Sequence, residues 1–425
     1  NLIYYDKEIG KHSFGLTLLQ SATGYHYEES SMAAEGIPLE SAKWNALSKE
    51  NVSLLDEWNS GLIEKQLISY MFRVNYDYNN KYLLTVSGRW DGASQLAEGN
   101  KWAFFPSAAL GWRLDQEEFL KDVTWLNQLK FRLGVGVTGN SAIDPYQTKG
   151  AIVSLYYPFG ATLAPGYAAS EPLIKDGAVA MANKDLSWEK TTQYNIGLDY
   201  SVLNGRISGV LDFYTSRTTD LLMAMTIPSL NGYTNTYANV GKTSNIGVDI
   251  TLNTVNIKTR DFEWSTSINA AWQKDKIDEL ANGKEDDINN NWFIGQALGV
   301  IYGYECGGLW KEEDAAEMAK FNAKGHSFQA GMVRPVDQNG DYKIDPNDDR
   351  VIIGHTRPRW TFGMTNTFTY KNFDLSVMMY GRFDYMVDTG GEWQGGRYMQ
   401  RKINYYNENN KNAEYQKRDH TELGG

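Results

Sequence analysis

The stretch KQLISYMFRVNYDYNNKYLLTVSGRW (Lys65–Trp90) alternates apolar and polar side chains along two successive segments. Every second residue from Ile68 to Tyr78 is apolar or aromatic, and the residues between them are mostly polar. A turn at Asn79–Lys81 follows, and the alternation resumes from Tyr82 to Arg89. A period of two residues predicts a β-hairpin with one apolar face. The first strand is about eleven residues long, roughly twice the usual length in a soluble domain. Its apolar face therefore has to be covered along an unusual length, either by protein or by lipid.

The same alternation recurs along the chain and predicts about a dozen antiparallel strands. Further segments follow this pattern at 14–18, 108–114, 129–138, 194–213, 246–253, 262–273 and 360–379. Short connections are expected near 6–11, 79–81, 115–128, 203–206, 255–261 and 371–372. Long loops are expected near 24–64, 91–103, 140–188, 217–242 and 274–358. Short turns at one end of the strands and long loops at the other are typical of outer-membrane β-barrels.

The composition restricts the class of protein. The chain has 425 residues, a mean hydropathy of −0.50 and a formal net charge of −11. It contains no run of about 18 apolar residues, which excludes a helical membrane protein. The negative charge argues against a nucleic-acid partner. The single cysteine, Cys306, excludes an intrachain disulfide, and the five histidines show no spacing typical of a metal site.

Two partners fit the tall apolar face: a second sheet, as in a soluble β-sandwich, or lipid. The sequence favours lipid, because the charged residues fall on the opposite face of the strands. An Arg or Lys that faces the middle of a bilayer costs about 2–4 kcal/mol. Aromatic residues also gather beside the short turns, where a membrane interface favours amphipathic rings; they include Tyr78, Tyr82, Tyr200, Trp264 and Tyr370. The predicted fold class is all-β, part of an antiparallel transmembrane barrel.

Several segments carry a resemblance to a known family. They are Leu84–Asn140, Leu186–Leu222, Tyr237–Leu252 (YANVGKTSNIGVDITL), Asp337–Asp345 (DQNGDYKID) and Tyr370–Arg382 (YKNFDLSVMMYGR). In combination they make the chain similar to SusC-like TonB-dependent outer-membrane transporters of Bacteroidetes, the SusC/RagA family.

The resemblance implies a 22-stranded barrel in the outer membrane of a Gram-negative cell, filled by an N-terminal plug. It also implies a SusD-like surface lipoprotein as a lid, and TonB as the source of energy. The implied function is the import of glycan oligosaccharides or oligopeptides. Residues 1–425 are expected to form part of the barrel, without the plug domain, the TonB box, the first strands or the last strands.

Polar residues on the strands are the first candidate site. They would contact the plug or line the solute path inside the barrel, although any one of them could merely face a wet interior. These lumen-facing candidates are Arg73, Arg89, Arg113, Arg132, Asn195, Asp199, Asp249, Asn269 and Asp374. Aromatic residues in the long loops could stack on sugar rings or bury peptide side chains, and could equally pack the loops together. These ligand-contact candidates are Tyr156, Tyr157, Tyr167, Trp292 and Trp310.

The segment DQNGDYKIDPND (Asp337–Asp348) is the second candidate site. Oxygen-bearing side chains occupy positions one, three, five, nine and twelve, and Lys343 at position seven would offer its backbone carbonyl. These residues are Asp337, Asn339, Asp341, Asp345 and Asp348. The spacing suits a structural calcium ion, but position six is Tyr342 where calcium loops of this kind have glycine. An acidic, solvated turn is the other interpretation, and both stay open. No organic cofactor is expected.

Two other functional classes have to be weighed against a transporter. One is a secreted, calcium-braced β-sandwich that acts as an adhesin or glycan-binding module. The other is a surface hydrolase, for which Glu117/Glu118 and Asp348/Asp349 would be the acidic pairs. Adjacent carboxylates usually point apart, so we expect no catalytic residues and no enzyme activity.

Overall fold

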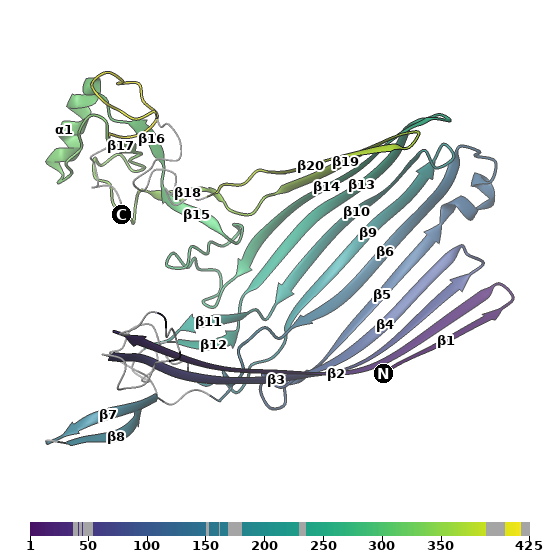
Figure 1. The fold of residues 1–425 in the computed structure, drawn as a ribbon, viewed down its shortest axis with the longest axis horizontal. Coiled ribbons are helices and arrows are strands. Elements are labelled where there is room, and N and C mark those ends of the chain that lie inside the picture. The colour runs from purple at the N-terminus through teal and green to yellow at the C-terminus, as the bar shows by residue number, and fades with distance from the viewer. Residues whose placement is uncertain are drawn as a thin grey trace. The chain divides into compact units, whose positions relative to one another are not determined.

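The computed structural model describes residues 1–36, 41, 45, 54–149, 153–160, 162–168, 181–228, 235–387 and 404–417 (Figure 1). The chain divides into two compact units. The first comprises Asn1–Asn269, Asp278–Lys284 and Thr365–Val377, and the second comprises Ala270–Ile277, Glu285–Met364 and Met378–Gly425. Among the described residues, no helix is long and apolar enough to cross a membrane.

Twelve strands form one sheet in the order β1-β2-β3-β4-β5-β6-β9-β10-β13-β14-β19-β20. Their bounds are β1 (Leu2–Ile9), β2 (His12–Glu35), β3 (Leu54–Tyr78), β4 (Tyr82–Ala93), β5 (Trp102–Arg113), β6 (Leu126–Asn140), β9 (Glu189–Val202), β10 (Ile207–Thr219), β13 (Lys242–Lys258), β14 (Phe262–Glu279), β19 (Trp360–Tyr370) and β20 (Phe373–Phe383). From β1 to β13 every neighbouring pair is antiparallel. The all-β class and the expected number of strands are confirmed.

The cross-strand register places the predicted apolar residues on one face of this sheet. One row, from β2 to β13, consists of Leu16, Val74, Val86, Ala108, Val135, Tyr194, Thr215 and Ile246. Val74, Val86, Val135 and Ile246 in this row are 39%, 38%, 40% and 37% exposed. Within the described residues, therefore, no second protein layer covers the row. A soluble sandwich would bury it, so the exposure argues against that alternative.

The connections of the sheet fall into two sets, as predicted. Figure 1 shows the tight turns between β1 and β2, β3 and β4, β9 and β10, and β13 and β14 at the same end of the sheet, with the longer loops of the first unit at the other end. Two of the tight turns use the left-handed backbone region, with φ of 56° and 53° at Asn79 and Asn80, and 58° and 77° at Asn204 and Gly205. Asn and Gly are the residues that adopt this conformation most readily.

The prediction of a loop near 24–64 is wrong for most of that range. β2 continues to Glu35 and β3 begins at Leu54, with Tyr25 opposite Lys65 and Glu35 opposite Leu54. Pairing with β1 stops at Leu19, and pairing with β4 stops at Leu67, so this part is a two-stranded ribbon. Neither face of such a ribbon has to be apolar, because both can meet water. The alternation that identifies the other strands is therefore weak here.

The remaining predicted long loops also contain secondary structure. In the first unit, β7 (Val153–Phe159) pairs with β8 (Thr162–Ala168), and β11 (Leu222–Thr226) pairs with β12 (Asn235–Asn239). In the second unit, β15 (Val300–Tyr304) pairs with β18 (Arg350–His355), and β16 (Cys306–Leu309) pairs with β17 (Val333–Pro335).

The second unit also contains a helix, α1 (Ala315–Ala323), which the sequence pattern did not predict. Its signals are the acidic run Glu312–Asp314 before it and two alanines at its start. The core of this unit consists of Trp310, Met318, Phe321, Phe328 and Met332, with Tyr342 and Ile344 packed against it. The helix supplies Met318 and Phe321, so it closes this small core rather than lying free.

One carboxylate ties the aromatic residues beside the short turns to the β5–β6 connection. Glu117 accepts hydrogen bonds from Trp112 Nε1 at 2.9 Å, from Tyr82 OH at 2.8 Å and from Lys81 Nζ at 3.0 Å. Its side chain is only 15% exposed. It lies in the turn, outside the strands that would span a membrane. The hydrogen bonds from Trp112, Lys81 and Tyr82 lower the pKa of the Glu117 carboxyl to about 2.

We predict that Glu117→Gln lowers the thermal stability of the folded barrel at pH 7, because the amide cannot hold all three donors. The folded-state pKa is below the ordinary value of 4.5. The stabilisation is therefore complete above that value and is lost as the pH falls towards about 2. Heat-induced mobility shifts in gels, measured from pH 7 to pH 2.5, should show wild type approaching the variant in acid. Glu118→Gln is the control, since the Glu118 side chain is 82% exposed. An equal loss of thermal stability in both variants would contradict the stabilising role of the Glu117 hydrogen bonds.

Candidate functional site

The face of the sheet opposite the apolar row carries most of the predicted lumen-facing residues. The register places together on this polar face Arg73, Arg89, Arg113, Arg132, Asn195, Asp199 and Asp249. Asn269 joins them through Thr251, whose Oγ1 donates to Asn269 Oδ1 at 3.1 Å. Asp374, on β20, accepts a hydrogen bond from Thr369 Oγ1 at 2.7 Å. That the polar face lines a lumen stays a prediction.

Arg132 is at the centre of an ion-pair network that joins three strands. Its Nε donates to Asp199 Oδ1 at 2.9 Å, and its Nη2 lies 3.1 and 3.0 Å from the two carboxylate oxygens of Asp212. The side chains of Arg132, Asp199 and Asp212 are 30%, 21% and 20% exposed. Asp249 lies opposite Asp212 in the register of β10 and β13. One guanidinium therefore pairs with two carboxylates, and a third carboxylate, that of Asp249, lies on the next strand opposite Asp212.

Gly197 is what allows this network to form. It lies opposite Arg132 on β6 and opposite Asp212 on β10. A Cβ at this position would lie 2.5 Å from Asp212 Oδ1 and 2.6 Å from Arg132 Cζ. Without a side chain on β9, the guanidinium can cross that strand. Neither Asp212 nor Gly197 is among the predicted site residues, although the alternation of Leu211 and Phe213 already indicates that Asp212 lies on the polar face.

A second network lies nearer the long-loop end of the polar face. Arg89 Nε lies 2.7 and 2.8 Å from the oxygens of Asp91, and its Nη2 donates to Ser69 Oγ at 2.9 Å. Ser69 is fully buried and Asp91 is 8% exposed. These contacts fix the ends of β3 and β4 where the loops begin.

Beyond Arg89, loops far apart in the sequence share one buried core, here called the mouth cluster. It consists of Ala93, Leu96, Ala97, Phe105, Ile143, Leu186 and Trp188. Trp188 Nε1 donates to Lys101 O at 2.8 Å. Asn239, at the end of β12, donates to Ser187 O at 2.8 Å and to Asp220 O at 3.0 Å. The segments around residues 91–102, 141–149, 181–188, 220–228 and 235–240 are therefore fixed to one another.

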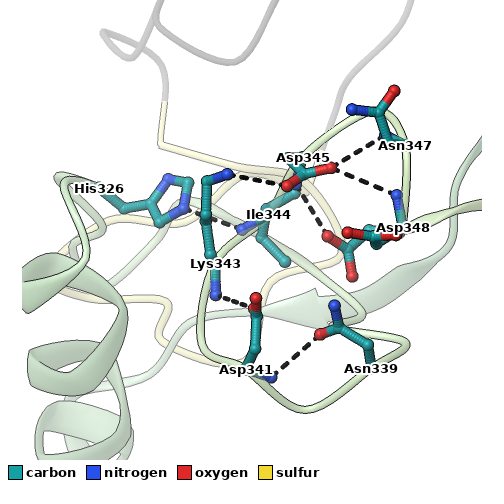
Figure 2. A network of polar contacts seen from close by, with 9 residues as sticks. His326, Asn339, Asp341, Lys343, Ile344, Asp345, Asn347 and Asp348 are labelled. Atoms are coloured by element: carbon teal, nitrogen blue, oxygen red, sulfur yellow. Dashed lines mark hydrogen bonds and ion pairs between the residues drawn. The ribbon is translucent and has the colours of Figure 1, made fainter.

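The acidic loop of the second unit is folded by its own side-chain oxygens (Figure 2). Asp337 accepts the N–H groups of Gly340 at 2.7 Å and Tyr342 at 2.8 Å. Asn339 accepts the N–H of Asp341 at 3.0 Å, as Figure 2 shows. Tyr342, at position six, has a φ of 63°. The backbone there adopts the left-handed conformation for which calcium loops use glycine, so the unexpected residue type does not change the course of the chain.

Further along the loop, a residue outside the predicted set makes the central contacts. Asp349 is fully buried, and it accepts the N–H groups of Gln338 at 2.9 Å and Asp345 at 2.8 Å. Asp349 comes one residue after Asp348, the last position of the twelve-residue calcium-loop spacing, so that spacing did not include it. Among the described residues, no group of three or more His, Cys, Asp or Glu side chains is placed to hold a metal ion. Calcium binding therefore stays a prediction.

The loop aromatics have different environments. Trp310 is fully buried in the core of the second unit, with the guanidinium of Arg334 4.6 Å above its ring. It packs the loop together, so it is unsuitable as a ligand contact. Trp292 is half-buried, and its backbone exchanges hydrogen bonds with Asp287 at 2.9 and 2.8 Å. The backbones of Tyr156, Tyr157 and Tyr167 belong to the β7–β8 hairpin, and their side chains lie outside the described part of the structure.

The adjacent carboxylates that a hydrolase would need have structural contacts instead. Glu117 holds the β5–β6 turn, and Glu118 pairs with Lys121. Asp349 is buried under the acidic loop, while Asp348 is exposed. The two members of each pair therefore do not act on a common point.

We predict that Arg132→Met destabilises the folded barrel by about 1–3 kcal/mol, the range for lost hydrogen bonds to charged groups. The change removes the guanidinium that pairs with the carboxylates of Asp199 and Asp212, and Asp249 lies opposite Asp212 on the next strand. Urea unfolding in detergent micelles measures the difference. Arg73→Met is the matched control: Arg73 lies on the same face and makes no ion pair with any described residue. Equal stabilities for the two variants would rule out the proposed role of the network.

We predict that Asp349→Ala loosens the acidic loop, because the backbone N–H groups of Gln338 and Asp345 lose their buried acceptor, and a lost hydrogen bond to a charged group costs about 1.5–3 kcal/mol. Limited proteolysis followed by mass spectrometry should show faster cutting within residues 337–349. Asp348→Ala removes the neighbouring exposed carboxylate, and in calcium-free buffer with a chelator this variant should be cut at the wild-type rate. Faster cutting in the Asp348 variant alone would reverse the two assignments.

Comparison with known proteins is consistent with this geometry. The family described as "TonB dependent receptor-like, beta-barrel" matches residues 6–423. The TonB-dependent receptor P3 of Formosa agariphila is 31% identical over 407 residues, covering 92% of this chain and 38% of that protein. The TonB-dependent receptor SusC of Bacteroides thetaiotaomicron is 34% identical over 357 residues, covering 79% of this chain and 33% of that protein. The chain thus spans less than two fifths of the length of these relatives.

Among solved structures, the RagAB peptide importer in its open-open state is similar in fold. Its TM-score is 0.79 at 22% sequence identity, and the match covers 99% of this chain and 44% of that one. At this identity the likeness concerns the fold alone. It agrees with the predicted all-β barrel portion.

Proposed function

The chain belongs to the TonB dependent receptor-like β-barrel family of outer-membrane proteins, and from this premise we propose that it is the barrel portion of a SusC-like active importer. The solute would be a glycan oligosaccharide or an oligopeptide, and the energy would come through TonB. The observation that carries the proposal is the division of the sheet into an exposed apolar face and an ion-paired polar face. The family consists of receptors and transporters rather than enzymes.

The finer parts of the proposal concern the solute, the lid and the polar face. SusC is the name of one relative, and the structure of similar fold is titled a peptide importer; both classes of solute are therefore considered. A SusD-like lipoprotein is the proposed lid, and it would meet the long-loop end of the sheet. The polar face would contact the plug and the passing solute; among the described residues Asp249, opposite Asp212, makes no ion pair, so its carboxylate could meet either of them.

Uptake by whole cells tests the function. Cells that lack the full-length protein are complemented with it and offered labelled pools of oligosaccharides and of peptides. One pool should accumulate only in complemented cells, and an uncoupler that collapses the proton gradient should abolish the accumulation. A full-length protein that stays monodisperse without detergent would instead support the secreted adhesin, and turnover of polysaccharide by the purified protein would support a hydrolase.

A structural calcium ion in the acidic loop is part of the proposal. The donors would be Asp337, Asn339, Asp341, Asp345 and Asp348, with the backbone carbonyl of Lys343. The loop-proteolysis assay described for Asp349 provides the test on wild type. If calcium braces the loop, chelation should speed cutting within residues 337–349 and added calcium should slow it again. An unchanged rate would leave the loop as an acidic, solvated turn.

A further inference from the structure

A groove of about 570 Å³ lies at the long-loop end of the first unit. It is lined by Lys65, Gln95, Asn140, Ser141, Ala142, Ile143, Asp144, Leu222 and Tyr237. These residues come from the middle of β3, the loop after β4, the end of β6 with the loop that follows it, and the β11–β12 pair. The volume falls within the range of about 300–1,000 Å³ that small-molecule sites occupy.

The groove opens on the polar face of the sheet. Lys65 alternates with Leu67 and Ser69 on β3 without an intervening irregularity, and Asn140 alternates with Gly136 and Thr138 on β6. The register has already placed Ser69 and Gly136 on the polar face. A solute that entered between the long loops and moved along this face would therefore meet the groove before it reached Arg132.

The floor of the groove is fixed before any ligand arrives. Ile143 belongs to the mouth cluster, and Leu222 and Tyr237 pack against that cluster. Gln95 Nε2 donates to Ser141 O at 3.0 Å, which joins two of the lining segments. Asn183 Nδ2 donates to Tyr237 O at 2.8 Å and holds β12 in place. A pre-organised site loses less conformational entropy on binding than a mobile one.

The charged groups of the groove are available to a ligand. Lys65 Nζ lies 4.8 Å from the centroid of the Tyr25 ring and makes no ion pair with any described residue. Asp144 is exposed, and its carboxylate has no hydrogen-bond or ion-pair partner in the part of the chain that the structure describes. The groove thus offers a free cation and a free anion, beside the amides of Gln95 and Asn140.

This combination fits a hydroxyl-rich solute better than a purely apolar or singly charged one. Each sugar hydroxyl is at once a donor and an acceptor, so it can donate to Asp144 and accept from Lys65 or an amide N–H. The apolar side chains of Ile143 and Leu222 and the ring of Tyr237 can cover the C–H face of a sugar ring. We infer that this groove is a saccharide subsite at the mouth of the barrel, the inference resting on the importer function proposed above.

The test uses the full-length protein purified with its native partner in detergent. The probes are an array of neutral and acidic oligosaccharides of two to eight units, and a peptide library of the same lengths. The oligosaccharide that binds best is then titrated calorimetrically against the wild type and the variants. Asp144→Asn and Lys65→Gln should each weaken binding by about tenfold or more, equivalent to about 1.4 kcal/mol.

Two matched controls come from the loop next to the groove. Glu98→Gln and Lys101→Gln remove exposed charges that do not line it, and both should bind like wild type. Heat-induced mobility shifts confirm that every variant is folded. Binding that is unchanged in the Asp144 and Lys65 variants would overturn the subsite while leaving the importer function intact.

Two other outcomes have distinct meanings. Peptides that bind the wild type and lose affinity in the groove variants would overturn the saccharide assignment, and would keep the groove as a peptide site. Failure of both arrays to bind, together with failure of cells to accumulate either solute, would overturn the importer function and the subsite with it.

Discussion

A hydrocarbon layer offers no water to pair a backbone N–H or C=O group, so every such group inside it has to be paired by the protein itself. The continuous ladder from β1 to β13 satisfies this requirement strand by strand. The same layer requires apolar side chains on one face, and the register places them in rows such as that from Leu16 to Ile246, in which Thr215 is the one residue with an aliphatic hydroxyl. Because the side-chain period is two, all remaining positions turn to the opposite face, and the charged residues gather there.

The crowding of charged side chains on the polar face explains why ion pairs and a glycine occur there. Arginine and aspartate on neighbouring strands neutralise one another, and glycine occurs where a guanidinium has to cross a strand, as at Gly197. At the long-loop end the backbone groups of the loops are not paired in a regular ladder. There the mouth cluster holds the loops together, and side-chain amides such as that of Asn239 pair with backbone groups. The polar groove next to that cluster combines a fixed floor with groups that remain free to bind.

The sequence predicted the sheet well because alternation is a local property that the bilayer enforces at every strand. It predicted most polar-face residues for the same reason. It failed where that pressure is absent: the β2–β3 ribbon beyond Gln20 has water on both faces, and α1 is held by the small core around Trp310. Contacts between distant segments, such as Asp349 beneath the acidic loop or Lys65 near Asp144, depend on how loops return to the sheet. No periodicity records such a return, so these contacts became visible only in three dimensions.

The β2–β3 ribbon has a consequence for how this protein can vary. Its outer part, roughly residues 21–35 and 54–66, pairs with no third strand within the part of the chain that the structure describes. Matched insertions of two residues in each arm would lengthen it without shifting the register of any strand below. An odd insertion in one arm would exchange its two faces, yet the damage would stop where β1 and β4 begin to pair. The ribbon is therefore a practical place to graft an affinity tag, because added residues there leave the pairing of the twelve-stranded sheet unchanged.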